Sequence, residues 1–363
     1  MCAYCGRPPV TAPMSRTGSL GPWDRLMVKH SLLILSLAAA HAASAVGVTP
    51  PAAAPRPLAH VAADRFQEWR NAAAATLIAR ADANSLATAA ALRYAGPRDG
   101  ARTASRSLEP SALELAASAA ELAPQDASIG WLRLQLCSGT PSCDMRDIAT
   151  VMRWVDADNA AAWLQTLAAA QKDRDPTEVD RILADMARGA RFDLYWNRIV
   201  VLMVDALEAA RNELPGSYAA SDSARLSAVS GIAAGEVIPP FAALVEACRE
   251  PGAAAERREL CLKLSKTMQR SDTIAAQMAG FSIERHLLSP DSREARAIAE
   301  RKHVLEWRVA AAARFDSPLL PWTKNAHARA RLVQMRAMPR EEDVCVAILR
   351  EHKMALDPPE VHP

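Results

Sequence analysis

The segment Leu122-Ala-Pro-Gln-Asp-Ala127, which leads into Trp131-Leu132, decides the fold expected for this chain. A similar start, Val155-Asp-Ala-Asp-Asn-Ala160 leading into Trp163-Leu164, follows 33 residues later. A period of this length accommodates two antiparallel helices and is the usual mark of stacked helical-hairpin repeats. Because such repeats build interaction surfaces rather than reaction centres, the pattern predicts an all-α binding protein.

The composition favours helices and gives no support to a nucleic-acid partner. The 363-residue chain has only 14 glycines and 5% aromatic residues, and it is rich in Ala, Leu, Glu and Arg, which are favourable in helices. Its 43 basic residues are nearly balanced by 41 acidic residues, so no strong positive field would attract phosphates. We therefore expect a helical protein without a nucleic-acid partner.

Residues 176–188 carry the clearest helical pattern. Asp175 is expected as the N-cap, Pro176 as the first helical residue, and Gly189 as the end of the helix. A single apolar stripe at positions i, i+3, i+4, i+7 and i+8 consists of Val179, Ile182, Leu183, Met186 and Ala187. The stripe predicts an amphipathic helix with one buried face.

The same periodicity predicts helices along most of the chain. The expected ranges before a possible division near 213–221 are 59–80, 84–95, 109–122, 126–137, 144–155, 159–172, 176–188 and 192–211. Those after it are 222–234, 240–250, 254–269, 272–288, 291–315, 323–338 and 341–355. The apolar run 199–204 is the one segment that suggests a strand, but the helical period continues on both sides of it, so we interpret it as a buried helix.

The N-terminal part has the pattern of an export signal. Residues 27–45 contain a ten-residue apolar run, 31–40, behind Lys29 and ahead of small residues, as in a secretory signal peptide. The run is shorter than the roughly 20 residues that a bilayer span needs, so no membrane span is expected after cleavage. We interpret residues 1–26 as a disordered upstream extension and 46–58 as a Pro-rich disordered spacer. The expected location is the bacterial periplasm or the medium.

An oxidising compartment makes disulfide bonds the expectation for the remaining cysteines. Cys137 and Cys143 bracket one turn, and Cys248 and Cys261 bracket another, with helical pattern on both sides of each turn. Both pairs are expected to close a helix-turn-helix. Cys345 is left over and is interpreted as a buried thiol rather than a nucleophile, because no base is clearly placed beside it.

A third helix start, Asp82-Ala-Asn-Ser-Leu86, extends the repeat pattern towards the N-terminus. With Pro124 and Ala157 in equivalent positions ahead of the Trp anchors, this part of the chain resembles a divergent tetratricopeptide-type repeat protein of the exported bacterial type. Val179 and Leu167 depart from the small residues that such repeats place inside their helices.

The resemblance implies a right-handed array of antiparallel helix pairs, an α-solenoid, over residues 59–212. A helical C-terminal region, 222–356, would pack on it. The concave face of the array would then be the surface that binds a protein partner, although the sequence does not identify its residues or the partner. The resemblance implies no activity and no cofactor.

Motifs for catalysis or metal binding are sparse. Glu300-Arg-Lys-His303 places a carboxylate and an imidazole on one helical face, and it supports an alternative: a metal-dependent or hydrolytic helical enzyme. A solvated charged face explains the same pattern and is favoured. Asp156-Ala-Asp158-Asn159 has the acids of a calcium loop but not its glycine, so we interpret the acids as residues at a helix N-terminus.

The only sizeable run of like charge lies near the C-terminus. It could form a docking patch for an anionic partner through Lys324, Arg329, Arg331, Arg336 and Arg340, with His327 among them. The favoured alternative is a helix face that pairs with the acids at 341–343 and their neighbours. The tryptophans at helical core positions are expected to fill gaps between helices; they are Trp131, Trp154, Trp163, Trp196 and Trp307.

Overall fold

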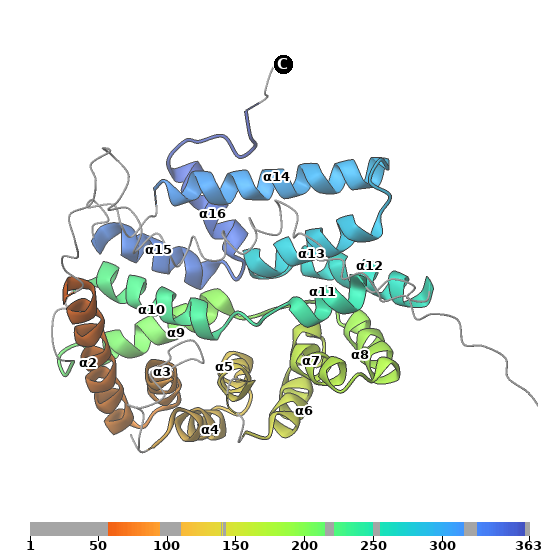
Figure 1. The fold of residues 1–363 in the computed structure, drawn as a ribbon. Helices are drawn as coiled ribbons and strands as arrows, with labels where there is room; N and C mark the ends of the chain where they lie inside the picture. The colour runs from red at the N-terminus through yellow and green to blue at the C-terminus, as the bar shows by residue number, and fades with distance from the viewer. Residues whose placement is uncertain are drawn as a thin grey trace, which may run out of the picture. The chain divides into compact units, whose positions relative to one another are not determined.

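A computed structural model of the chain describes residues 57–94, 110–138, 140, 143–214, 221–249, 255–315 and 325–359. All regular secondary structure within these ranges is helical (Figure 1), which confirms the all-α fold class. The first helices are α2 (Pro57–Arg80), α3 (Ala83–Arg93), α4 (Ala112–Leu122), α5 (Ala127–Ser138), α6 (Met145–Val155), the 3-10 turn η1 (Ala160–Trp163), α7 (Leu164–Lys172), α8 (Pro176–Arg188) and α9 (Trp196–Ala209). The later helices are α10 (Asp222–Glu236), α11 (Ala242–Arg249), α12 (Ala255–Met268), α13 (Ile274–Leu287), α14 (Arg293–Ala313), α15 (Asn325–Ala337) and α16 (Glu341–Glu351).

Helix α8 confirms both its expected ends and its expected buried stripe. The Asp175 side chain accepts a hydrogen bond from the Glu178 N–H at 3.0 Å, and Pro176 occupies the first turn. All five apolar residues of the stripe are buried. The segment 199–204 is helical as well, within α9.

The three repeated helix starts share one capping arrangement. The Asp82 side chain accepts from the N–H of Ser85 at 2.9 Å, and the Asp126 side chain accepts from the N–H of Ser128 at 2.9 Å. Asn159 accepts from the N–H of Ala161 at 3.1 Å in the same way. Each side chain satisfies a donor that the first turn of a helix otherwise leaves without a partner.

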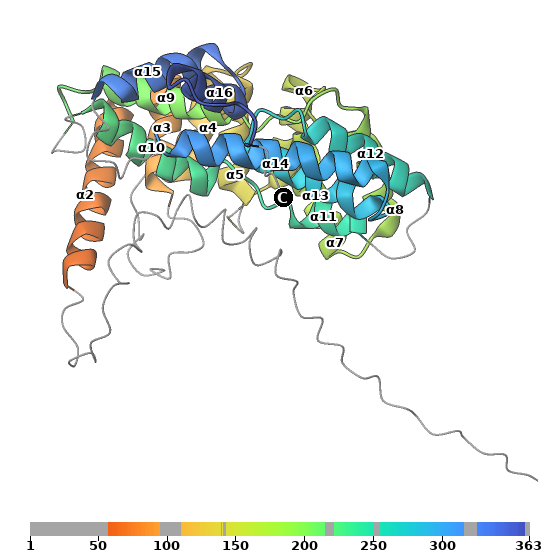
Figure 2. The ribbon, with the colours of Figure 1, turned by 90° about the horizontal axis from the view of Figure 1, so that it is seen from above.

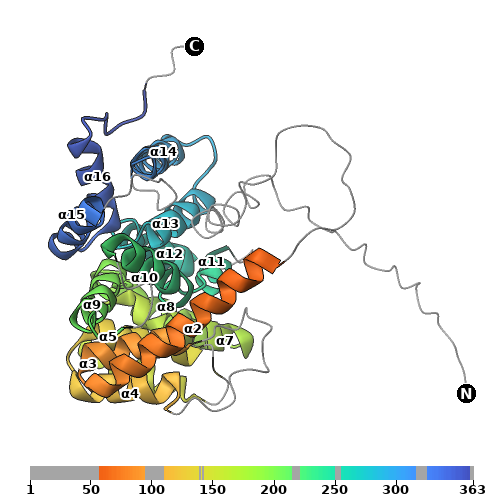
Figure 3. The ribbon, with the colours of Figure 1, turned by 90° about the vertical axis from the view of Figure 1, so that its left-hand side faces the viewer.

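Successive helices pack against one another from α3 to α8, while later helices cover one side of this group. Helix α4 lies against α3 and α5, and α6 lies against α5, η1 and α7. On the side away from α4 and α6, α9 and α10 contact α3 and α5, and α11 contacts α7 (Figures 1 and 3). The indole N–H of Trp131 on α5 donates to the Val237 carbonyl at 3.1 Å across this contact. On this side, helices α3, α5 and α7 are therefore covered by other parts of the chain.

Helices α14, α15 and α16 lie beyond this layer. Helix α15 packs on α9 and α10, whereas the long helix α14 packs on α13 and α16 (Figure 2). Ile298 and Leu305 of α14 form a small apolar cluster with Phe281, separate from the main core. Among the helices in the described ranges, none combines the length and the apolar character that crossing a bilayer requires.

The expected helix 192–211 is wrong at its N-terminal end. Helix α9 begins at Trp196, and Tyr195 before it has a left-handed backbone with φ 60°. The preceding residues are extended because their backbone groups bond elsewhere: Arg191 pairs with the 158–160 segment, and the N–H of Leu194 donates to Asp272. Gly189 lies so close to this segment that an added Cβ would come within 2.9 Å of the Ala160 nitrogen.

The signal peptide 27–45, the extension 1–26 and nearly all of the spacer 46–58 lie outside the described residues, as does Lys324. Helix α2 begins at Pro57, two residues before the expected start. These N-terminal assignments remain predictions.

Candidate functional site

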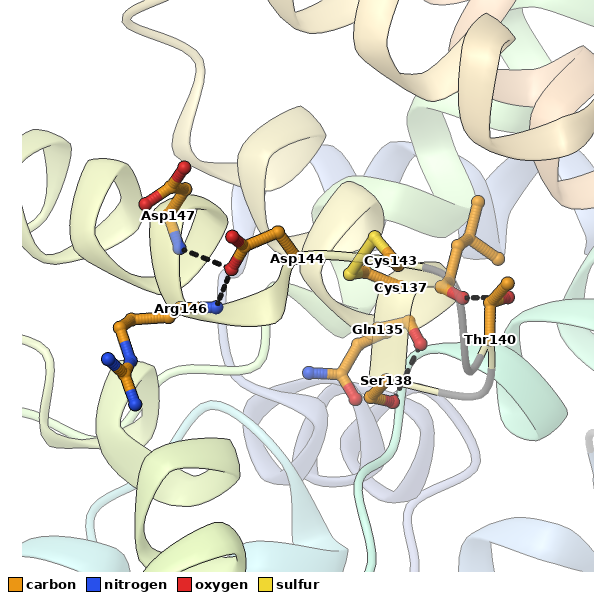
Figure 4. Close-up of a disulfide and its surroundings, with 9 residues drawn as sticks. Gln135, Cys137, Ser138, Thr140, Cys143, Asp144, Arg146 and Asp147 are labelled. Carbon is orange, nitrogen blue, oxygen red and sulfur yellow. Dashed lines mark hydrogen bonds between the residues drawn. A yellow bond between two sulfur atoms is a disulfide. The ribbon is translucent and has the colours of Figure 1, made fainter.

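The Cys137–Cys143 disulfide connects the end of α5 to the start of α6, as expected (Figure 4). The two Cα atoms are 5.4 Å apart. Beside it, the carboxylate of Asp144 caps α6 by accepting from the N–H of Arg146 at 3.0 Å and of Asp147 at 3.4 Å. The disulfide and the cap together fix where α6 leaves the turn.

The second expected disulfide is also confirmed. Cys248 of α11 and Cys261 of α12 are bonded, with Cα atoms 5.7 Å apart. Cys345 on α16 is half-buried rather than buried, and it packs against the main core. The ring of His352 stacks on Phe315 with centroids 4.0 Å apart, so this imidazole is held by an aromatic ring.

The arginines of the basic C-terminal run pair with acids of neighbouring helices. Arg329 lies 2.5 Å from Asp222 of α10, and Arg336 bonds Asp205 of α9. Arg340 pairs with Glu342 at 2.7 Å, as the ion-paired alternative expects. Arg331 is buried and donates to Gln334, while His327 is exposed. Most of the positive charge in the described part of this run is thus balanced locally.

Glu300 and His303 are both exposed on α14. Glu300 lines a pocket between helices, but His303 is not part of its wall. Among the residues that the structure describes, no group of three or more His, Cys, Asp or Glu side chains is placed to hold a metal ion. The Glu-x-x-His spacing therefore has no further ligands around it there.

The tryptophans fall into three classes of exposure, and the expectation for Trp154 is wrong. Trp131 is fully buried, and Trp163, Trp196 and Trp307 are partly buried against the core. Trp154 is 73% exposed. Its helical position matches that of a core residue, but the buried side of α6 is formed instead by Ala149 and Met152.

The exposed side of α6 forms a surface that we call the α6 face: Arg146, Asp147, Thr150, Val151 and Trp154. Val151 is 54% exposed and lies one helical turn before Trp154. Thr150 and the charged Arg146 and Asp147 provide polar groups around these apolar side chains. An apolar centre with a polar rim is the usual composition of a protein interface.

A buried polar network that the sequence did not reveal surrounds the extended segment 189–195. Asp156, 4% exposed, accepts hydrogen bonds from the hydroxyl of Tyr195 and the guanidinium of Arg191. Burial raises the pKa of Asp156 above its ordinary value, although the bond with Asn159 and the charge of Arg191 oppose the shift. We expected Asp156 at a helix N-terminus; it instead follows the end of α6.

Two further carboxyl groups join this segment to the C-terminal helices. Burial raises the pKa of Asp272 to about 7, against the hydrogen bond from the Leu194 N–H. Burial likewise raises the pKa of Glu341 to about 7, against a hydrogen bond of 2.8 Å from the Ile274 N–H, and the nearby Asp272 adds to the shift. Their backbones are joined too, because the Glu341 N–H donates to the Asp272 carbonyl at 2.8 Å. Asp272 lies in the turn before α13 and Glu341 is the first residue of α16, so the two acids are far apart in the sequence and no local motif predicts their contact.

The network has the features of a structural joint rather than a reaction centre. Its polar groups are mutually bonded, and the backbone N–H groups of Asp193, Leu194 and Ile274 all donate to its side chains. The α6 face is the better candidate for an intermolecular site, because its apolar side chains Val151 and Trp154 are exposed. Comparison with protein-family models, with curated proteins and with solved structures finds no significant match to this chain.

Proposed function

We propose that the chain is an exported helical-repeat protein that binds another protein, as a binding or assembly module of the bacterial cell envelope. The observation that carries the proposal is the 73% exposure of Trp154 beside Val151 on the α6 face. Leaving an indole in water forgoes a large part of its hydrophobic free energy, and Trp is one of the residue types enriched among interface anchors.

The proposal includes a tetratricopeptide-like array built from the pairs α3–α4, α5–α6 and η1/α7–α8. Two sets of contacts support this array. Consecutive helices pack together, and α3 also contacts α5. The side-chain amide nitrogen of Gln165 on α7 donates to the side-chain oxygen of Gln135 on α5 at 3.4 Å. The common capping of Asp82, Asp126 and Asn159 supports the same pairing.

In this proposal the outer side of the array binds the partner. The inner helices α3, α5 and α7 are already covered by α9, α10 and α11, whereas α6 presents uncovered apolar side chains. Export to the periplasm or the medium is part of the proposal and is supported by the signal-like segment 27–45 and by the two disulfides.

Retrieval of the partner from an envelope extract by the tagged, exported chain tests this function. The unchanged chain should retain a specific protein. The Trp154→Ala chain should retain at least about tenfold less of it, the loss typical of an interface anchor. Val333→Ala is the matched control, because Val333 is 60% exposed but lies on α15. Equal retention by all three chains would refute the α6 face as the binding surface.

A further inference from the structure

A pocket of about 580 Å³ lies between α12, α13, α14 and α16. This volume falls within the range of roughly 300–1,000 Å³ that is common for small-molecule sites. The pocket is formed by other helices than the α6 face, so an inference about it is independent of the proposed protein-binding function.

The pocket exists because α14 does not close onto α12. Ile298 and Leu305 hold α14 against Phe281 of α13, and α16 packs against it further along. Between these contacts α14 presents Glu300 and Arg301 to the pocket, and charged side chains are costly to bury without partners. Closer packing of α14 on α12 would bury these charges, which is unfavourable.

The charge of the pocket wall is mainly positive. Four cationic side chains line it against two acidic ones. Glu342 is already paired with Arg308 at 2.8 Å, and Arg301 lies 3.9 Å from the buried Glu284. Within the described residues, Lys266 and Arg270 are exposed and form no ion pair. Lys266 lies in the last turn of α12 and Arg270 two residues beyond the end of this helix, and both line the pocket.

The wall also offers an apolar surface and an unsatisfied polar atom. Phe281, Val304 and Leu305 line the pocket near the cations. Gln269 is 9% exposed; its amide nitrogen donates to Glu284, while its Oε1 has no hydrogen-bond partner among the described residues. Apolar side chains beside polar groups are typical of a site that orients a small organic ligand.

We infer that this pocket binds a small organic anion with an apolar body. The anionic group would lie at Lys266 and Arg270, and the hydrocarbon part would contact Phe281, Val304 and Leu305. The exposed Glu300, which also lines the pocket, opposes an anion and limits its affinity.

Fluorescence titration with 1-anilinonaphthalene-8-sulfonate tests the inference, with N-phenyl-1-naphthylamine as a neutral probe of nearly the same skeleton. The whole exported chain should bind the sulfonate more tightly than the amine. The double variant Lys266→Gln/Arg270→Gln should bind the sulfonate more weakly by roughly tenfold or more. Its affinity for the amine should stay within about twofold of that of the unchanged chain. Glu300→Gln should tighten sulfonate binding.

Lys263→Gln/Arg285→Gln is the matched control, because both residues are exposed on helices that form the pocket, α12 and α13, but lie outside its wall, and the net charge changes equally. It should leave sulfonate binding unchanged, as should Trp154→Ala. The inference would be overturned if the control variant lost as much sulfonate affinity as Lys266→Gln/Arg270→Gln, or if the unchanged chain bound both probes equally. Loss of sulfonate binding in the Trp154→Ala chain would also overturn the inference, because the dye would then lie on the α6 face.

Discussion

The side-chain carboxyl group of Asp272 accepts a hydrogen bond of 2.8 Å from the backbone N–H of Leu194, 78 residues earlier in the chain. This bond fixes the extended segment before α9 against the turn between α12 and α13. The Glu341 N–H donates to the carbonyl of Asp272 at 2.8 Å and adds the start of α16 to the same joint. Three distant parts of the chain thus meet at one buried acid.

The free energy of unfolding should fall as the pH rises from about 4 to about 7. The pKa values of Asp272 and Glu341 are raised to about 7 in the folded chain, so the folded state holds protons that the unfolded chain has released. Asp272→Asn keeps an acceptor oxygen for Leu194 and removes the charge. At pH 8 it should be more stable than the unchanged chain by on the order of 1–3 kcal/mol, and at pH 4 nearly equal.

Urea unfolding at pH 4, 6 and 8 measures this difference. Asp291→Asn, at an exposed position in the turn before α14, serves as the control and should follow the unchanged chain at every pH. A stability difference for Asp272→Asn that is independent of pH would show that its carboxyl group does not titrate in this interval.

Buried and exposed tryptophans should respond differently to truncation. Trp131→Ala removes a fully buried indole and its bond to the Val237 carbonyl, so it should cost about 3–5 kcal/mol of unfolding free energy. Trp154→Ala should change this free energy by no more than about 0.5 kcal/mol, because its indole is in water. Chemical denaturation of both variants measures the contrast, and comparable losses would contradict the assigned exposure.

Removing either disulfide should destabilise the chain moderately. The bonds close short loops, with sequence separations of 6 and 13 residues, so the loop-entropy estimate is about 2–3 kcal/mol for each. Cys248→Ser/Cys261→Ser should lose slightly more than Cys137→Ser/Cys143→Ser because its loop is longer. Thermal unfolding with and without a reducing agent tests this, and a chain insensitive to reduction would contradict it.

Cleavage of the signal peptide should leave a mature N-terminus near Val46. Intact-mass measurement of the chain recovered from the periplasm or the medium identifies the first residue. A chain that keeps residues 27–45 and stays in the cytoplasm would contradict export.

Local features of the fold could be predicted from the sequence because local interactions determine them. The start of α8 follows from Asp175 and Pro176 and its end from Gly189, and the two disulfides follow from cysteines that bracket turns. The apolar run 199–204 was correctly predicted to be helical rather than a strand, because the helical period of apolar residues continues on both sides of it.

Features that depend on distant contacts could not be predicted. Periodicity identifies the apolar side of a helix but not what covers it, so neither the covering of α3 and α5 by α9 nor the exposure of Trp154 followed from the sequence. The contacts of Asp272 could not be predicted for the same reason, because its partners Leu194 and Glu341 are distant in the sequence.

Photocrosslinking in living bacteria tests the α6 face most directly. With a photoreactive aromatic residue in place of Trp154, irradiation should join the exported chain to a specific envelope protein, and the same residue in place of Val333 should not. Absence of any adduct from position 154, or the same adduct from both positions, would contradict the claim that the exposed side of α6 is where this protein binds its partner.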